Sequence, residues 1–239
     1  MSAFNESISL RRLVPEILDG LPADDPKAVH SRRDLVRINA LMFNAPVMAG
    51  LLRKHLGSAP RRILEIGAGD GKFMLAVARR LAKDWPAVEL TLLDRIDLVS
   101  VETRAGFGKL GWHVETVTAD VFAWMENAGR QRFDAVTANL FLHHFDNADL
   151  ADLLAGLQRF APLLLATEPY RGSFPLAAAR LLWAIGANGV TLHDAAASVR
   201  AGFAGMELSA LWPDGSGKPL EERRRGLFSH VFAAGNDEP

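Results

Sequence analysis

The sequence predicts an α/β fold built on a mostly parallel sheet, and two observations support this. Short apolar runs typical of buried strands alternate along the chain with segments of helical periodicity. The first apolar run, 63–66, leads into a turn with glycine at 67, 69 and 71, and a helical pattern begins at Phe73. Glycine lets a ligand approach the backbone closely, and the N–H groups at a helix start favour a polar or anionic group. The sequence therefore predicts a nucleotide-type pocket at this turn.

The other elements follow in order from the same patterns. Apolar residues at helical spacing over 27–56 predict two helices divided by Pro46. The charged run 221–225 is interpreted as a solvated helix face, with a phosphate-binding patch as the less favoured alternative. Asp146 is the expected N-cap of a helix that runs to Phe160. Strands are expected at 88–93, 112–119, 133–138, 162–167, 206–212 and 227–233, with further helices at 73–83, 97–110, 121–127, 174–187 and 194–203.

Composition excludes several classes of protein. The 239 residues include 27 basic and 28 acidic ones, so the net charge of −1 gives no global field for nucleic acid. The absence of cysteine excludes disulfide scaffolds, thiolate metal sites and cysteine nucleophiles. The N-terminus is too polar for a signal peptide, and no apolar run reaches the ~18 residues that span a bilayer. We expect a soluble, cytoplasmic protein, and its oligomeric state stays open.

The spacing around the glycine turn separates the nucleotide-binding families. The dinucleotide pattern G-x-G-x-x-G requires glycine where this chain has Lys72, and the phosphate loop requires serine or threonine where it has Phe73. What remains is Glu65 followed by G-x-G-x-G over 67–71. In this the sequence resembles the class I S-adenosylmethionine-dependent methyltransferases. The resemblance implies a Rossmann-like seven-stranded sheet, mostly parallel with an antiparallel C-terminal strand, helices on both faces and an N-terminal helical extension.

The same resemblance implies which residues hold S-adenosylmethionine. The acidic residue before the glycines, Glu65, would engage the amino end of the methionine part. Asp94 ends the next predicted strand 23 positions after Gly71, near the ~20-residue interval at which such folds place a carboxylate against ribose hydroxyls. Asp120 and Val121 would meet the adenine. For Asp94 and Asp120 the alternative is a turn or helix-capping role. The complete expected set is Glu65, Gly67, Ala68, Gly69, Gly71, Asp94, Arg95, Asp120, Val121, Asn139 and Leu140.

The candidate catalytic residues lie in the loop NLFLHHF at 139–145. It follows the strand expected beside the first one, where open parallel sheets bind ligands, and it resembles the fourth motif of family members that methylate small molecules. His143 or His144 could serve as a general base for a hydroxyl acceptor, and we expect neighbouring side chains to point apart, with His143 preferred. The alternative is a histidine that caps the following helix or packs under the cofactor. A mechanism by proximity alone also stays open.

Other titratable residues give weaker candidates. His193 is a second candidate base, although Asp194 is better explained as a helix N-cap. Glu168 ends a predicted strand on the active face and is a candidate for substrate binding, whereas His230 is assigned to core or surface. No metal site is expected, because the histidines show no close i, i+4 pair with an acidic residue nearby.

The resemblance implies methyl transfer from S-adenosylmethionine to a small acceptor by in-line displacement. Three aromatic residues expected near the pocket, Phe43, Phe141 and Phe145, favour a hydrophobic or aromatic acceptor, with O-methylation of a phenol or quinol preferred. The alternatives are C-methylation of a quinone-like ring, a nicotinamide-dependent oxidoreductase and a non-catalytic binding module. We expect an N-terminal helical cap at 1–58 and the methyltransferase domain at 59–236.

Overall fold

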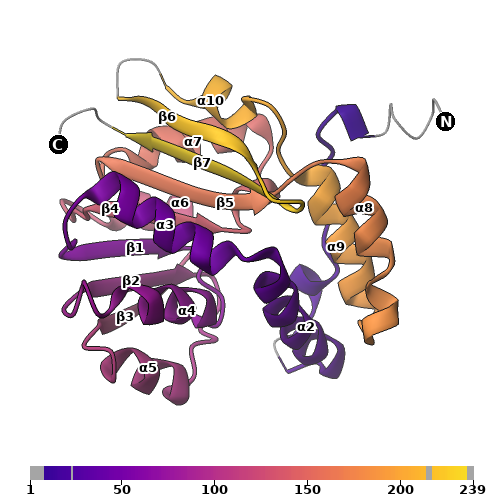
Figure 1. Ribbon diagram of the computed structural model, residues 1–239, viewed down its shortest axis with the longest axis horizontal. Coiled ribbons are helices and arrows are strands. Elements are labelled where there is room, and N and C mark those ends of the chain that lie inside the picture. Colours follow the sequence, from indigo (N-terminus) through magenta and orange to yellow (C-terminus); the bar gives the residue numbers. More distant parts are fainter. Residues whose placement is uncertain (1–7, 23, 214–216, 236–239) are drawn as a thin grey trace.

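The computed structural model describes residues 8–22, 24–213 and 217–235, which form a seven-stranded sheet with helices on both faces (Figure 1). The strand order is β3-β2-β1-β4-β5-β7-β6. All neighbouring strands are parallel except β7, which is antiparallel to both β5 and β6. This confirms the predicted fold class. The strands are β1 (Arg62–Ile66), β2 (Glu89–Asp94), β3 (His113–Thr118), β4 (Ala135–Asn139), β5 (Leu163–Pro169), β6 (Lys218–Arg225) and β7 (Ser229–Gly235).

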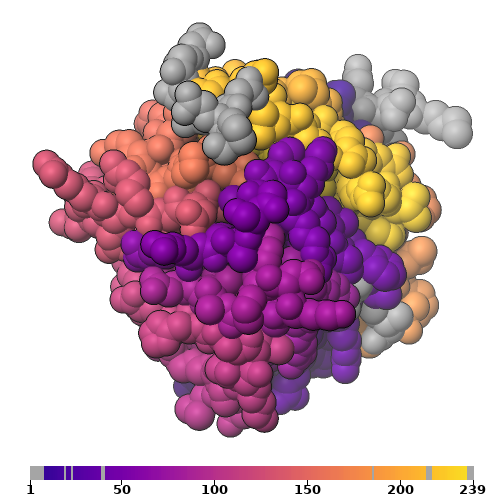
Figure 2. Space-filling model, turned by 60° about the vertical axis from the view of Figure 1, so that its left-hand side comes forward, coloured from indigo at the N-terminus to yellow at the C-terminus, as the bar shows by residue number. Residues whose placement is uncertain are grey.

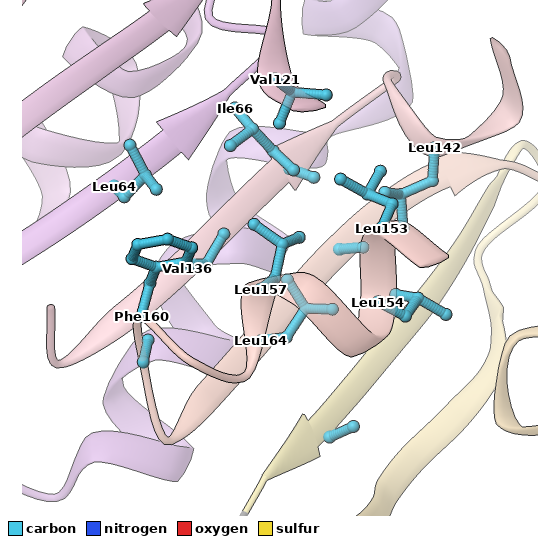
Figure 3. Close-up of a cluster of buried hydrophobic side chains, with 14 of the residues drawn as sticks. Leu64, Ile66, Val121, Val136, Leu142, Leu153, Leu154, Leu157, Phe160 and Leu164 are labelled. Carbon is cyan, nitrogen blue, oxygen red and sulfur yellow. The ribbon is translucent and has the colours of Figure 1, made fainter. Parts of the chain in front are cut away.

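One face of the sheet is covered by α6 (Val121–Asn127), α7 (Asn147–Leu157) and α10 (Glu207–Leu211). Figure 3 shows side chains of the strands packed against this layer, among them Leu64, Val136 and Leu164 opposite Leu153 and Leu157 of α7. All five are at most 3% exposed. Burying one such side chain contributes about 1.5–3 kcal/mol, so this cluster holds α7 firmly against β1, β4 and β5.

The other face is covered by α3 (Asn44–Leu56), α4 (Lys72–Leu81) and α5 (Val101–Gly108). The space-filling view shows α3 lying across this face toward β6 (Figure 2). Arg53 of α3 pairs with Asp84 after α4 at 3.1 Å, and Lys54 pairs with Glu221 of β6. Helix α3 therefore ties the N-terminal part of the chain to both halves of the sheet.

A third group of helices, which we call the helical lobe, lies at the carboxyl ends of the parallel strands (Figure 1). It consists of η1 (Leu18–Gly20), α2 (Pro26–Met42), α8 (Ser173–Arg180), η3 (Leu182–Ile185) and α9 (Gly189–Ala201). Ligands bind at this edge in open α/β sheets, where the strand order reverses between β1 and β4. Among the described residues, no helix combines the length and apolar character needed to cross a membrane.

The prediction for the sixth strand is wrong. Residues 206–212 contain α10, and its Leu208 and the C-cap residue Trp212 are both buried at helical i, i+4 spacing. The sixth strand is β6. It includes the charged run 221–225, so the interpretation of this run as a helix face is also wrong. Charged side chains suit β6 because it is an edge strand, where they discourage pairing with another chain. The last two strands, β6 and β7, form an antiparallel hairpin with the turn at 226–228.

Several predicted helix boundaries also differ. The first two helices separate at Phe43, which has a left-handed φ of 57°, and not at Pro46. Pro46 lies in the first turn of α3, where a missing N–H costs nothing. The helix predicted at 194–203 is α9, which begins five residues earlier because Asn188 caps it by accepting from the N–H of Thr191. The segment 174–187 divides into α8 and η3.

Candidate active site

The glycine turn between β1 and α4 has the conformation that its residues predict. Gly67, Gly69 and Gly71 have φ values of 66°, 54° and 71°. A Cβ at Gly67 would lie 2.2 Å from Cδ2 of Phe141, so glycine is required there for packing as well. A Cβ at Gly69 would meet nothing within 4 Å. The backbone at Gly69 is therefore open to a ligand, which fits a cofactor that lies against the turn.

Glu65 lies in β1 just before the turn and is only 2% exposed. Its register partner in β4 is Thr137, whose hydroxyl donates a hydrogen bond to the Glu65 carboxylate. Burial raises the pKa of Glu65 to about 8, against the lowering effect of Thr137. Without a cationic partner this side chain is therefore mainly protonated at pH 7.

Asp94 ends β2 and holds the glycine turn in place. Its carboxylate accepts from the N–H of Gly69 at 2.8 Å and from that of Ile96 at 3.1 Å. The neighbouring Arg95 is exposed. Asp94 therefore has the turn role that was its alternative interpretation. The contact of Asp94 with ribose stays a prediction.

Asp120 caps α6, which is the helix-capping role expected as the alternative to adenine binding. Its carboxylate accepts from the N–H groups of Phe122 and Ala123 at 2.9 and 3.3 Å. Val121 is 5% exposed and belongs to the core beneath α6. The adenine contacts of both residues stay a prediction.

The loop after β4 begins with a hydrogen-bonded polar cluster. Asn139 is 8% exposed and accepts from Nδ2 of Asn44 at 2.9 Å and from the hydroxyl of Thr167 at 2.8 Å. Leu140 has a left-handed φ of 52°, and its N–H donates to the carbonyl of Thr167. Leu140 therefore turns the chain sharply toward the histidine loop. The cofactor contacts expected of Asn139 and Leu140 stay a prediction.

His143 lies in η2 (Leu142–His144), is 2% exposed and forms a buried pair with Glu168 of β5. Its Nδ1 is 2.7 Å from Oε2 of Glu168. The other oxygen of Glu168 accepts from the backbone N–H groups of Phe141 and Leu142 at 3.0 and 2.9 Å. Glu168 therefore fixes both the backbone of η2 and the orientation of the imidazole.

A second carboxylate, Glu16, lies on the other side of the ring. Its Oε1 is 3.6 Å from Nε2 of His143. Burial alone would lower the pKa of His143, but its contacts with Glu16 and Glu168 raise it to about 9. Burial alone would likewise raise the pKa of Glu168, and His143 together with the backbone N–H groups lowers it. The three groups thus form one charged, mutually stabilised cluster.

The N-terminal segment that carries Glu16 is fixed by long-range contacts. Arg11 donates to the carbonyls of His143 and Phe145 at 3.1 and 2.5 Å. Asp194 accepts from the N–H groups of Ile17 and Leu18 at 2.8 and 3.0 Å. The N-cap interpretation of Asp194 is wrong, because this residue lies inside α9 and is 3% exposed. It holds the N-terminal segment in place.

Glu16 could not be predicted from the sequence, because no local pattern relates it to a loop more than 120 residues further along. The expectation that His143 and His144 point apart is also wrong. Their ring centroids are 4.3 Å apart with an interplanar angle of 32°, so the two rings lie next to each other on η2.

The remaining candidates lie elsewhere. His193 pairs with Asp194 at 3.0 Å, and the buried His230 pairs with Glu222 at 2.9 Å. The three expected pocket aromatics do not form one pocket. Phe145 packs edge-on against both Phe141 and Phe122, at 5.1 and 5.6 Å between ring centroids. Phe43 is 66% exposed and lines a separate cavity of about 430 Å³, together with Leu41, Met42, Pro46, Val47, Arg225, Gly226, Leu227 and Phe228.

Comparison with known families identifies the central part of the chain. Residues 63–161 match a family model described as a methyltransferase domain, and this range includes the glycine turn, Asp94, Asp120 and the histidine loop. Together with the sheet order, the match defines a methyltransferase of the class I fold. Residues 63–161 therefore form a methyltransferase domain of the S-adenosylmethionine-dependent type, which argues against the oxidoreductase alternative. No curated protein sequence matches the chain.

Solved structures share the fold at low sequence identity. An O-methyltransferase family protein from Burkholderia thailandensis superposes with a TM-score of 0.65 at 18% identity, covering 98% of this chain and 68% of that one. The plantazolicin methyltransferase BpumL in complex with SAH gives 0.62 at 13% identity, covering 89% and 91%. The pyocyanin biosynthetic protein PhzM gives 0.58 at 19% identity, covering 89% and 59%. At these identities the likeness shows the fold.

Proposed function

We propose that this enzyme methylates a hydroxyl group of a small, apolar and preferably aromatic molecule such as a phenol or quinol. The observation that carries the proposal is the buried His143–Glu168 pair, with Nδ1 and Oε2 2.7 Å apart in the loop after β4. This loop packs on the glycine turn through Phe141 and Gly67. A base held at this position is suited to take the proton of a hydroxyl during methyl transfer.

The chemistry divides between the donor and the chain. S-adenosylmethionine, when bound, supplies an electrophilic methyl group on a sulfonium. In our proposal the Nδ1–H of His143 donates to Glu168. Because the pKa of His143 is about 9, Nε2 also carries a proton while Glu16 faces it, so His143 acts as the base only after Nε2 has lost that proton. Glu168 is a positioning residue that keeps this tautomer and stabilises the imidazolium once the proton has moved. The acceptor must displace the Glu16 carboxylate from the Nε2 side of the ring.

The residues of the turn are suited to hold the cofactor. We propose that the open backbone at Gly69 receives its methionine part, that Glu65 engages the amino group and that Asp94 accepts from the ribose hydroxyls. A neutral Glu65 must then lose its proton when it meets the ammonium group. Ala68, Arg95, Asp120, Val121, Asn139 and Leu140 complete the proposed cofactor site.

The acceptor class rests on weaker support. The names of two similar folds, an O-methyltransferase family protein and a pyocyanin biosynthetic protein, favour a small-molecule acceptor. The helical lobe at the carboxyl edge supplies a cover for such a molecule, in keeping with a cap over 1–58 and a catalytic domain over 59–236. C-methylation of a quinone-like ring would need the same base to ionise a ring hydroxyl, so the position of the methyl group in the product separates the two reactions.

The first test is calorimetric binding of S-adenosylmethionine and S-adenosylhomocysteine to the parent protein and to Asp94→Ala. We expect affinity to fall about 10- to 100-fold in the variant, the range for a lost hydrogen bond to a charged group. Asp97→Ala, at an exposed aspartate in the same loop, is the matched control and should bind as the parent does. A parent protein that is folded but binds neither compound would refute the proposed cofactor site. With binding established, phenols and quinols are screened with His143→Asn, which should lower kcat about 10²- to 10⁴-fold.

A further inference from the structure

Three metal-ligating side chains from two distant segments meet beside η2. Glu16 comes from the N-terminal segment, and His143 and His144 come from the loop after β4. Each offers one ligand atom, and these three atoms all lie within 4.8 Å of one another. We propose that Glu16, His143 and His144 form a binding site for a divalent ion of the zinc class, for which imidazole nitrogens and carboxylate oxygens are standard ligands.

The distance between the two best-placed ligand atoms leaves room for a metal ion to replace their direct ion pair. The proton on Nε2 of His143 is released when the metal binds. Oε1 of Glu16 and Nε2 of His143 are 3.6 Å apart, which is longer than the 2.7–3.2 Å of an N–H···O hydrogen bond. Two ligands that each lie about 2.0–2.1 Å from a tetrahedral zinc ion are about 3.3–3.4 Å from each other. The present separation is therefore closer to the spacing of two zinc ligands than to a direct hydrogen bond.

A second, independent observation is that both of these ligands are oriented by outer partners. Glu168 binds Nδ1 of His143, so the ring directs Nε2 toward Glu16. Glu168 is itself held by two backbone N–H groups of η2. A carboxylate behind a histidine in this way is the usual outer partner of a zinc ligand. The hydroxyl of Ser198 in α9 donates to the same oxygen of Glu16 that faces His143.

The third ligand needs only a local adjustment. The imidazole rings of His143 and His144 already lie side by side, with centroids 4.3 Å apart. The ligand atom of His144 lies within 4.8 Å of those of Glu16 and His143. Three protein ligands leave a fourth position open, as in zinc sites that take water or another small ligand.

An ion at this site has a consequence for methyl transfer that rests on the proposed function. An ion held on Nε2 of His143 occupies the place that the acceptor hydroxyl must reach. Metal binding and acceptor binding are then mutually exclusive, so zinc acts as an inhibitor that competes with the acceptor. The metal site itself depends only on the three ligands and their outer partners.

The test is a titration of the full chain, freed of metal by dialysis against a chelator, with zinc chloride in competition with a chromophoric chelator. We expect one zinc ion per chain, with affinity at least 10-fold lower in Glu16→Gln and in His144→Asn. His113→Asn, at the exposed histidine that begins the edge strand β3, is the matched control and should keep the parent affinity. Visible absorption of bound Co²⁺ gives a second readout, because its intensity reports coordination by these ligands.

The outcomes separate the two proposals. No zinc binding by the folded parent, or unchanged affinity in both ligand variants, overturns the metal site. Loss of binding in His113→Asn does so as well. Circular dichroism and S-adenosylmethionine affinity of each variant show that the fold is intact. A parent that binds zinc but not S-adenosylmethionine would contradict the proposed function and leave the metal site standing.

Discussion

Two buried carboxylates at the carboxyl edge of the sheet have opposite properties. Glu65 in β1 and Glu168 in β5 are 2% and 0% exposed. The pKa of Glu65 is raised to about 8 by burial, whereas the pKa of Glu168 is lowered although burial acts on it in the same direction. Glu65 has the hydroxyl of Thr137 as its partner, and Glu168 has His143 and the backbone N–H groups of η2. Burial alone therefore does not set the charge of a side chain; its partners do.

The difference corresponds to two kinds of site. Glu168 already has its cationic partner in the folded chain, so it is charged and fixed before any ligand binds. Glu65 has none, so it keeps a proton until a cation arrives. The preformed pair at Glu168 suits a group that must hold a base in one orientation. The neutral acid at Glu65 suits a site that becomes charged only when a positively charged ligand binds.

The largest expected effect comes from removing the charge of Glu168. In Glu168→Gln the imidazole loses the carboxylate that fixes its tautomer, and we expect kcat to fall about 10²- to 10⁴-fold. The Kd of S-adenosylmethionine should not change, whereas unfolding of the site would weaken cofactor binding. Glu222→Gln, at the other buried Glu–His pair, is the control and should keep its kcat per folded molecule. Equal kcat in parent and Glu168→Gln would contradict the positioning role.

The next effect concerns stability and pH at Glu65. The folded chain keeps a proton on Glu65 up to about pH 8, whereas the unfolded chain releases it near its ordinary pKa of about 4.3. The contribution of Glu65 to the free energy of unfolding therefore falls as pH rises from about 4 to about 8 and is level above that. Glu65→Gln mimics the protonated form, so it should exceed the stability of the parent by about 1 kcal/mol at pH 5 and by on the order of a few kcal/mol at pH 8.

Urea unfolding of both proteins between pH 5 and pH 8 measures this difference. Glu89→Gln, at an exposed glutamate of β2, serves as the control and should follow the parent at every pH. Parallel stability curves for the parent and Glu65→Gln would show that Glu65 is already ionised in the folded chain.

A related effect is proton release on cofactor binding. If Glu65 engages the ammonium group of S-adenosylmethionine, its carboxyl must ionise, and at pH 7 about one proton leaves per cofactor bound. Calorimetry in buffers of different ionisation enthalpy counts these protons. We expect the release to vanish in Glu65→Gln and to decline in the parent above pH 8. Binding without proton exchange at pH 7 would place the ammonium group elsewhere.

The smallest effect is expected at Thr137, the hydrogen-bond partner of Glu65. Thr137→Val removes the hydroxyl but keeps the shape, and we expect a loss of about 1 kcal/mol in the free energy of unfolding at pH 6. Thermal or urea unfolding measures it, with Thr91→Val at a buried threonine of β2 as the control. A loss in Thr137→Val no larger than that in the control would mean that the bond contributes little to stability.

The sequence predicted the part of the site that depends on neighbouring residues. The turn over 67–71 needs glycine for its backbone and for the contact with Phe141, and Asp94 follows at an interval set by one helix and one strand. Asp120 and Asp146 cap the helices α6 and α7 because their side chains reach N–H groups two and three residues ahead. Such features are local, so a pattern along the chain is enough to find them.

The tertiary structure decided what depends on partners far apart in the sequence. The prediction of a strand at 206–212 failed because burial of Leu208 and Trp212 under the sheet favours a helix, and β6 is a strand only because β7 pairs with it. The sequence does not decide between His143 and His144 as the base, because the carboxylates beside the His143 ring, Glu16 and Glu168, come from distant segments. By itself the sequence determined the fold class and the cofactor turn, because both follow from short-range periodicity and backbone conformation. Burial and the distances between side chains decide which histidine is held, by which carboxylates and with what charge. Only the folded chain sets these distances and this burial.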